Sequence, residues 1–302
     1  MSGRPARSAS AVVVNYNAGK SLTDCVASLR QASINEIVVV DNCSTDGSIT
    51  TLESEYPEVR IVRLQRNRGF GAGANVGVAA TRGQSVLVCN PDLVLEPSCL
   101  VRLEAVLASR PDVAIAGPRL LTADGETYPS ARTFPSLSDS LGHAFLGLIR
   151  PDNRFTARYK MRDLDRSHAT DVDWVSGACF LARRDAFESV GGFDEAYFMY
   201  VEDVDLCWRL HRAGWAVRYE PAASVTHLQG LSTARHPYRM IAAHHRSLLR
   251  FAARSSRGSR RALLPLVAAG LLVRMVLAWA DHANGARRPP SRGAIGESHA
   301  PD

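Results

Sequence analysis

Residues 11–17 read Ala-Val-Val-Val-Asn-Tyr-Asn, a β-branched run that ends in polar side chains. Three later runs are also rich in β-branched residues and end at polar residues. They are Ile37–Val40 before Asp41, Val59–Arg63 before Gln65, and Ser85–Cys89 before Asn90. Segments with apolar residues at helical spacing separate these runs. The alternation predicts β-α-β units and therefore an α/β fold, with a mostly parallel, twisted sheet flanked by helices.

The polar ends of these strands are where we expect a ligand. In open α/β sheets, ligands bind beyond the carboxyl ends of the strands. At one such end, Asp41 can accept a hydrogen bond from a nucleobase N–H. At another, Asp92 follows Pro91, and a hard cation such as Mg²⁺ takes one or two carboxylates and completes its shell from phosphates and water. The first part of the chain is therefore predicted to bind a nucleotide.

A glycine-rich segment, Asn67–Gly77, leads into a predicted helix. Glycines at the start of a helix allow a diphosphate or a sugar to approach the backbone closely. They equally allow the helix to pack tightly against a neighbouring element. The sequence leaves both explanations open.

The second half of the chain adds acids and a histidine. Glu202-Asp-Val-Asp205 opens a predicted helix after the aromatic and apolar run Tyr197–Val201. A carboxylate beside an apolar wall can have a pKa suited to general-base work, although the positive end of the helix dipole also favours acids there. His227, on a strand-like segment, can act as a metal ligand. Between residues 119 and 171 the periodicity fades, which predicts a long loop.

Composition excludes several classes of protein. The 302 residues are 46% hydrophobic and 22% charged, which suits a globular chain and neither a disordered nor a collagen-like one. The net charge is +6, but the basic residues are scattered and no aromatic stacking platform accompanies them, so we expect no nucleic-acid binding. The six cysteines form no Cys-x-x-Cys pair and are expected to be reduced. No signal peptide is expected before residue 11, which predicts a cytoplasmic catalytic part.

Near the C-terminus, arginines precede a mostly apolar stretch, Ala262–Ala280, which Pro265 and Arg274 interrupt. A membrane-spanning helix needs about 20 apolar residues, and an arginine at its centre costs about 2.5–3.5 kcal/mol. An amphipathic helix in the membrane interface, with its arginines on anionic headgroups, fits the same residues better. A terminal helix docked on the core is the alternative. The tail beyond His282 is expected to be disordered.

As an ordered set, these motifs resemble the GT-A fold of family-two inverting glycosyltransferases, which use nucleotide sugars. The segments that match, in the family's order, are Val12–Asn17, Val39–Ser44, Asn67–Gly77, Asn90–Asp92, Gly191–Asp194, Glu202-Asp203 and His227. The resemblance implies a division at residues 11–118 for the nucleotide sugar and 119–250 for the acceptor and catalysis. Residues 251–302 would form the membrane-associating helix and tail.

The resemblance also implies roles for individual residues. The nucleotide-sugar site would comprise Asn15, Asn17, Asp41, Asn67, Gly69, Asn75 and Asn90. Asp92 and His227 would hold Mg²⁺ or Mn²⁺, and Asp203, paired with Glu202, would be the general base. The family's Asp-x-Asp motif begins here with Asn90, so the expected metal site has one fewer charge.

Within the family, the chain is most similar to rhamnosyltransferases that act on N-acetylglucosaminyl-diphospho-polyprenol in the linker between arabinogalactan and peptidoglycan. That similarity implies transfer of L-rhamnose from dTDP-rhamnose to a lipid-linked polyprenyl diphosphate acceptor, in cell-wall or surface polysaccharide synthesis. The enzyme would be peripheral, on the anionic cytoplasmic face of the cell membrane. Another donor such as a UDP-hexose stays open, as does a non-catalytic protein of the same fold that binds a nucleotide sugar or serves as a scaffold.

Overall fold

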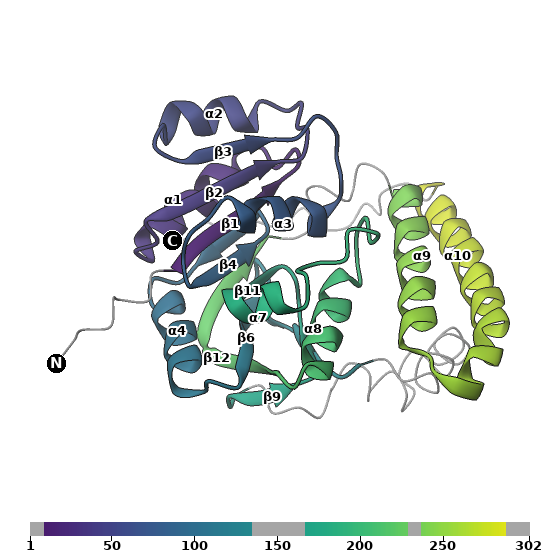
Figure 1. Ribbon diagram of the computed structural model, residues 1–302. Coiled ribbons are helices and arrows are strands. Elements are labelled where there is room, and N and C mark those ends of the chain that lie inside the picture. The colour runs from purple at the N-terminus through teal and green to yellow at the C-terminus, as the bar shows by residue number, and fades with distance from the viewer. Residues whose placement is uncertain (1–8, 135–166, 229–236, 288–302) are drawn as a thin grey trace, which may run out of the picture.

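A computed structural model describes residues 9–134, 167–228 and 237–287. All four predicted runs are strands. They are β1 (Ala9–Asn15), β2 (Glu36–Asp41), β3 (Arg60–Arg63) and β4 (Ser85–Cys89). These strands are parallel neighbours in the order β3-β2-β1-β4, as the β-α-β pattern predicts (Figure 1).

The sheet continues beyond β4 with strands that follow β4 in the sequence. It has ten strands, and its main path runs β3-β2-β1-β4-β11-β6-β12-β5. The added strands are β5 (Leu93–Leu95), β6 (Val113–Leu121), β7 (Thr127–Tyr128), β9 (Thr170–Val172), β11 (Cys179–Arg183) and β12 (Ala216–His227). Antiparallel β11 separates β4 from β6, and β12 is parallel to β6. The predicted α/β fold with a mostly parallel sheet is therefore confirmed.

Helices cover both faces of the sheet. One face packs against α1 (Ser21–Gln31), α2 (Ser48–Glu55) and α4 (Cys99–Ser109), and the other against α3 (Phe70–Ala79), α7 (Arg184–Ser189) and α8 (Glu202–Arg212). Strand residues alternate between the two cores: Val13 and Val39 face the first, whereas Val12 and Val40 face the second. Each central strand thus buries both of its faces, which explains why its sequence is a continuous apolar run.

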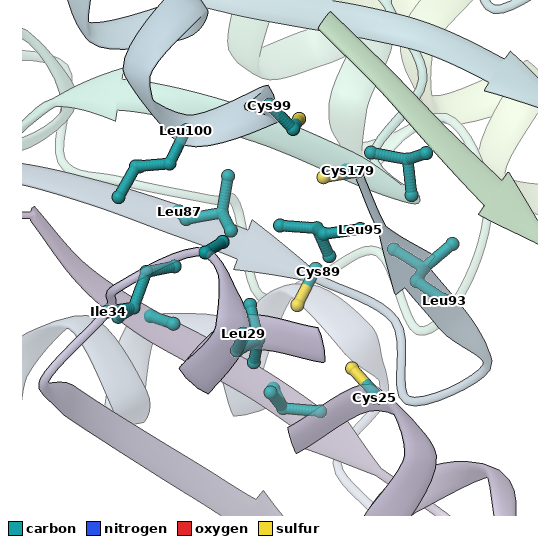
Figure 2. Packing of buried hydrophobic residues seen from close by; sticks show 14 of the residues in the cluster. Cys25, Leu29, Ile34, Leu87, Cys89, Leu93, Leu95, Cys99, Leu100 and Cys179 are labelled. Atoms are coloured by element: carbon teal, nitrogen blue, oxygen red, sulfur yellow. The ribbon is translucent and has the colours of Figure 1, made fainter. Parts of the chain in front are cut away.

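The first core contains a group of cysteines among leucines (Figure 2). Its members are Cys25, Cys89, Cys99 and Cys179, all buried. All six cysteines of the chain are free, as expected, and Cys43 is the exposed one. Burial raises the pKa of the Cys99 thiol to about 12, so the thiol stays protonated and packs as a small apolar group.

The expected loop between residues 119 and 171 is partly ordered. Its described part contains the end of β6, then β7, and the short strand β8 (Ala131–Arg132), which pairs with β10 (Trp174–Val175). The prediction of a loop was wrong for β7 and β8, because two-residue strands are too short to show a periodicity, and it ended β6 three residues early. Residues 135–166 lie outside the described part of the chain.

Two long helices end the described chain. Helix α9 (Pro237–Ser255) is followed by the 3₁₀ turn η1 (Gly258–Leu263) and by α10 (Leu264–Arg287), which runs back along α9 (Figure 1). The two are joined by the Trp279 indole N–H, which donates to the Tyr238 carbonyl at 3.2 Å, and by an edge contact between those rings. The predicted C-terminal helix is therefore present. It continues past His282, where a disordered tail was expected, as far as Arg287, and the remaining residues lie outside the described part.

The glycine-rich segment packs α3 onto β1 and β2. A Cβ atom added to Gly77 would lie 2.2 Å from Cγ1 of Val12, and one added to Gly73 would lie 2.8 Å from Cγ1 of Val14. Such distances are far below van der Waals contact. Of the two explanations left open by the sequence, tight packing therefore accounts for these two glycines.

We expect Gly77→Ala to lower the free energy of unfolding by about 1–3 kcal/mol, because the added methyl overlaps Val12. In an unobstructed helix the same change would stabilise by about 1 kcal/mol, so the sign is diagnostic. Chemical denaturation measures the effect. Combining it with Val12→Ala, which makes room, should recover about 1 kcal/mol or more relative to the sum of the single changes. Additive effects would show that the overlap is not the cause.

Candidate active site

A cavity of about 510 Å³ opens at the carboxyl ends of the parallel strands. Tyr16 follows β1, Asn42 follows β2, Asn67 follows β3 and Asn90 follows β4, and all four line it. Ser176, the segment Phe198–Tyr200, and Arg239 with Met240 from α9 complete the wall. Of the residues predicted for the site, the lining contains Asn67, Gly69, Asn90, Asp92 and His227. The rule that ligands bind at strand ends therefore located the cavity.

Asp92 and His227 meet because β5 and β12 pair. His227 is the register partner of Leu93, the residue after Asp92. The Nε2 atom of His227 lies 3.2 Å from Oδ1 of Asp92, and each side chain is only 11–12% exposed. Within the described residues, neither Asp92 Oδ1 nor His227 Nδ1 has a hydrogen-bond partner. Buried polar atoms are normally satisfied, so this pair is short of partners in the cavity.

These two side chains fit a divalent metal ion. A carboxylate oxygen and an imidazole nitrogen are both ligands of such ions. The described residues contain no group of three or more His, Cys, Asp or Glu side chains arranged to hold a metal. A metal at this place would therefore take two ligands from the protein and the rest from a diphosphate and water. Asn90, in place of the family's first acid, lines the same cavity.

Three residues predicted to hold the base and ribose form one buried network instead of lining the cavity. The Asn15 amide donates to the hydroxyls of Ser44 and Ser48, both at 3.0 Å. The backbone N–H of Ser44 donates to Asp41 Oδ1 at 3.1 Å, and that of Thr45 donates to Asn17 Oδ1 at 2.7 Å. Asn15, Asn17 and Asp41 thus shape the loop after β2. Any direct contact of theirs with a nucleotide stays a prediction.

Asn75 and Gly69 connect α3 to the segment before α8. The Asn75 side chain accepts from the Phe193 N–H and donates to the Phe193 carbonyl, both at 2.9 Å, and it does not line the cavity. Gly69 has φ of +88°, and a Cβ there would lie 1.9 Å from the carbonyl oxygen of Phe198. Only glycine fits that position. Asn67 Oδ1 accepts from the Gly69 N–H at 2.9 Å, which fixes the turn.

The predicted general base lies in the first turn of α8. The backbone N–H groups of Gly177 and Val204 donate to the two carboxylate oxygens of Asp203, each at 2.8 Å. Ser176, which precedes Gly177, and Tyr200, which shortly precedes α8, both line the cavity. The Asp203 carboxyl therefore lies directly behind the cavity wall that Ser176 forms. Asp203 itself is not among the lining residues.

Of the two neighbouring carboxyls Glu202 and Asp203, only one is ionised at neutral pH. Burial raises the pKa of Glu202 to about 8, and the charge of Asp203 adds to that effect. Glu202 is 6% exposed, and its Oε2 has no hydrogen-bond partner among the described residues. Burial raises the pKa of Asp203 as well, but its two backbone donors and the charge of Arg132 oppose the rise. Asp203 is therefore the better ionised member, and Glu202 keeps its proton at neutral pH.

The segment that leads into α8 is strained and is held by α9. Tyr200 and Val201 have left-handed φ values of +67° and +70°, which a β-branched residue such as valine rarely adopts. The Ser247 hydroxyl donates to the Met199 carbonyl at 3.0 Å, and the ring of His244 contacts that of Tyr200 edge-on. These contacts from α9 keep the Asp203 backbone in place. Sequence patterns showed no sign of this support, because it joins residues far apart in the chain.

Two arginines of α9 strengthen this attachment. Arg250 and Arg254 both form ion pairs with Asp194, and Nε of Arg254 lies 3.3 Å from the buried Asp205. The Arg250 guanidinium also lies 5.3 Å from the centre of the Tyr197 ring. Helix α9 is therefore fixed by ion pairs to the segment before α8 and to α8 itself.

Replacing Glu202 by Gln should flatten the dependence of stability on pH. The folded protein holds the Glu202 proton up to about pH 8, whereas the usual carboxyl pKa is 4.5. Between these values the folded state binds more protons, so stability falls as pH rises. Between pH 5 and pH 8 the free energy of unfolding of the unmodified protein should fall by an amount on the order of 2–4 kcal/mol because of this group, and that of the Gln variant should not. Denaturation at both pH values measures it, and parallel curves for the two proteins would contradict the assignment.

Comparison with known proteins gives a consistent result. Residues 10–191 match the model of the family described as Glycosyl transferase family 2. An N-acetylglucosaminyl-diphospho-decaprenol L-rhamnosyltransferase of Mycobacterium tuberculosis is 40% identical over 266 residues, which cover 84% of this chain and 86% of that protein. Rhamnosyltransferase WbbL of Escherichia coli is 32% identical over 168 residues, covering 53% of this chain and 60% of that protein.

Solved structures with the same fold are more distant in sequence. The mannosyltransferase PcManGT of Pyrobaculum calidifontis, in complex with GDP-Man and Mn²⁺, superposes with a TM-score of 0.55 at 16% identity, covering 92% of this chain and 79% of that one. Residues 1–349 of S. aureus TarS superpose with a TM-score of 0.54 at 16% identity, covering 93% of this chain and 75% of that one. At this identity the likeness supports the fold alone.

Proposed function

The chain belongs to glycosyl transferase family 2, and from that membership we propose that it transfers L-rhamnose from dTDP-rhamnose to a polyprenyl-diphospho-GlcNAc acceptor. It is a glycosyltransferase. The observation that carries the choice of donor and acceptor is the 40% identity to the mycobacterial rhamnosyltransferase along 84% of this chain. The cavity supports it, because the pair Asp92–His227 and the wall in front of Asp203 belong to the same space.

In the proposed reaction, Asp203 accepts the proton of the acceptor hydroxyl as that oxygen attacks the anomeric carbon of the donor. The N–H groups of Gly177 and Val204 orient the carboxylate. Glu202, protonated beside it, avoids a second negative charge behind the wall. A single base acting from one side of the sugar gives inversion at the anomeric carbon.

Asp92 and His227 are the residues that would hold Mg²⁺ or Mn²⁺ in this reaction. When bound there, the ion offsets the negative charge that builds up on the departing diphosphate. Asn67 and Asn90 line the same cavity, and their side-chain amides can bond to the nucleotide sugar. Asn42 also lines it, but its amide is bonded to the Gly69 carbonyl and the Arg68 N–H. Replacement of the family's first acid by Asn90 lowers the charge of the site by one.

We expect Asp203→Asn to lower kcat about 100- to 10,000-fold, because the amide cannot take the proton. Affinity for dTDP-rhamnose should stay within about twofold, because the base contacts the acceptor and not the nucleotide. The measurement is transfer to a short-chain prenyl-diphospho-GlcNAc acceptor, with donor binding followed separately. An equal loss of kcat and of affinity for dTDP-rhamnose would show that Asp203 is a binding or folding residue.

The same assay tests the donor and the alternatives. Purified protein with dTDP-rhamnose should yield product only when the acceptor is present. Turnover with UDP-glucose or UDP-galactose instead would identify another donor. Donor binding without turnover, with every acceptor tried, would favour the non-catalytic protein.

The outer face of α10 supports the proposed membrane surface as a partner. Gly258–Ala280 is long and apolar enough to cross a membrane: its most apolar 18 residues have a mean hydropathy of 2.1, and only 6% of those are buried in the protein. One face of α10 packs on α9, Val267 is buried, and the outer face is apolar. Leu266, Leu272, Val273, Val276 and Leu277 are 40–57% exposed.

Arg274, which would be costly in a spanning helix, lies on the side facing α9. Its positive charge, together with burial as the larger cause, lowers the pKa of both His244 and His245 on α9. The outer face therefore keeps its apolar character along its length. Arg257, Arg260 and Arg261 are exposed at its start and complement anionic headgroups. This arrangement supports a helix pair that lies on the cytoplasmic face of the membrane as a peripheral element.

Introducing charge on this face should release the protein from membranes. We expect Leu272→Glu with Val276→Glu to weaken binding to anionic phospholipid vesicles on the order of tenfold or more. Val101→Glu is the matched control, because Val101 is 65% exposed on α4 and far from the helix pair in sequence and fold. Cosedimentation with vesicles measures both variants. Equal effects of the two changes, or none, would refute the assignment of this face.

A further inference from the structure

The cavity contains one permanently positive side chain in its described lining, that of Arg239. Arg239 lies in the first turn of α9 and is exposed. Arg250 and Arg254, later in the same helix, are engaged in ion pairs with Asp194. Arg239 forms no ion pair or hydrogen bond with any other described residue. An arginine that is free inside a ligand cavity is available to an anion.

The neighbours of Arg239 connect the cavity to the apolar helix. Tyr238 packs against the rings of Trp279 and His282 near the end of α10. Met240, on the other side of Arg239 in sequence, lines the cavity together with Phe198 and Met199. Arg239 therefore lies where the cavity meets the helix pair, with apolar side chains beside it.

The proposed reaction brings two diphosphates to this cavity, one on each substrate. The donor diphosphate departs during the reaction, and its charge is met by the ion that Asp92 and His227 would hold. The acceptor diphosphate links a sugar to an apolar chain and stays intact. Among the lining residues in the described ranges, only the Arg239 guanidinium can neutralise that second diphosphate.

We propose that Arg239 binds the diphosphate of the lipid-linked acceptor, with the first isoprenyl unit against Phe198, Met199 and Met240. This proposal rests on the proposed function and adds the subsite that recognises the acceptor. A guanidinium binds phosphate oxygens through two parallel N–H groups, which makes such contacts strong and directional. Arg239 then selects a sugar linked through diphosphate over the same sugar on a neutral linker. By fixing the diphosphate, it also places the acceptor hydroxyl within reach of the Asp203 carboxylate.

The test compares acceptors with and without a diphosphate. Full-length protein is measured in neutral detergent, without phospholipid, using short-chain prenyl-diphospho-GlcNAc and a neutral alkyl-GlcNAc. Arg239→Gln should raise the KM for the diphosphate acceptor roughly 10- to 100-fold, as expected for hydrogen bonds to a charged group. The KM for the donor and kcat/KM for the neutral acceptor should change less than about twofold. Arg239→Lys should recover part of the loss, because the charge remains but the paired N–H groups do not.

Arg246→Gln is the matched control. Arg246 lies two turns along the same helix, is exposed and does not line the cavity. The Arg246→Gln substitution should leave the KM values for the donor and the acceptor unchanged. An equal effect of Arg246→Gln would show a general attraction of α9 for anions and would overturn the proposal.

Three other results would also overturn it. A rise in the KM for the donor alone would assign Arg239 to the nucleotide sugar. An equal loss with the neutral acceptor would make its role structural. Unchanged kinetics in detergent, together with weaker cosedimentation of Arg239→Gln with anionic vesicles, would assign it to lipid headgroups. Binding of prenyl-diphospho-GlcNAc is also measured calorimetrically without donor, so that a loss of affinity on Arg239→Gln supports this subsite even if the enzyme turns out to use another sugar.

Discussion

The antiparallel pairing of β5 with β12 is the constraint on which the site depends. It places His227 opposite the residue that follows Asp92, so that the two proposed metal ligands meet although they lie far apart in the sequence. β12 is also bound along its length to β6, so the pair rests on the central sheet and not on a loop. A rigid base of this kind suits metal ligands, whose distances must be held within a few tenths of an ångström.

The α8 side of the cavity is built differently. Here the carboxyls of Glu202 and Asp203 are adjacent and buried, and the site stabilises a negative charge on only one of them. The backbone just before them is strained. Burial raises the proton affinity of both groups, while backbone N–H groups stabilise charge on Asp203 alone. The acidic pair at this helix start thus provides the proposed base and a neutral neighbour. Helix α9 contributes by holding the strained residues, so the C-terminal part of the described chain supports the geometry of the proposed base.

Local pattern predicted much of this molecule. The strands β1, β2 and β4 were evident because each buries both faces. Asp92 and His227 were singled out because each follows or ends a strand, and the structure brings the two side chains together. Asn15 and Asp41 were predicted at the strand ends correctly, but their side chains turn into the loop network, which depends on contacts with Ser44 and Ser48 that spacing does not reveal. The short strands β7 and β8, the α9 contacts and Arg239 were missed for a related reason. They depend on tertiary partners, and no period in the sequence marks them.

The position of α9 has a consequence for any attempt to obtain a water-soluble catalytic fragment. A boundary at residue 250 would discard Arg254 and Phe251, of which the first pairs with Asp194 and the second is buried against Trp208. A boundary between Ser255 and Gly258 would keep these contacts and remove the apolar helix alone. Yet the fragment would still expose the surface of α9 that α10 now covers. The helix that supports the segment before α8 is thus also the helix that α10 covers, and shortening the chain exchanges one exposed apolar surface for another.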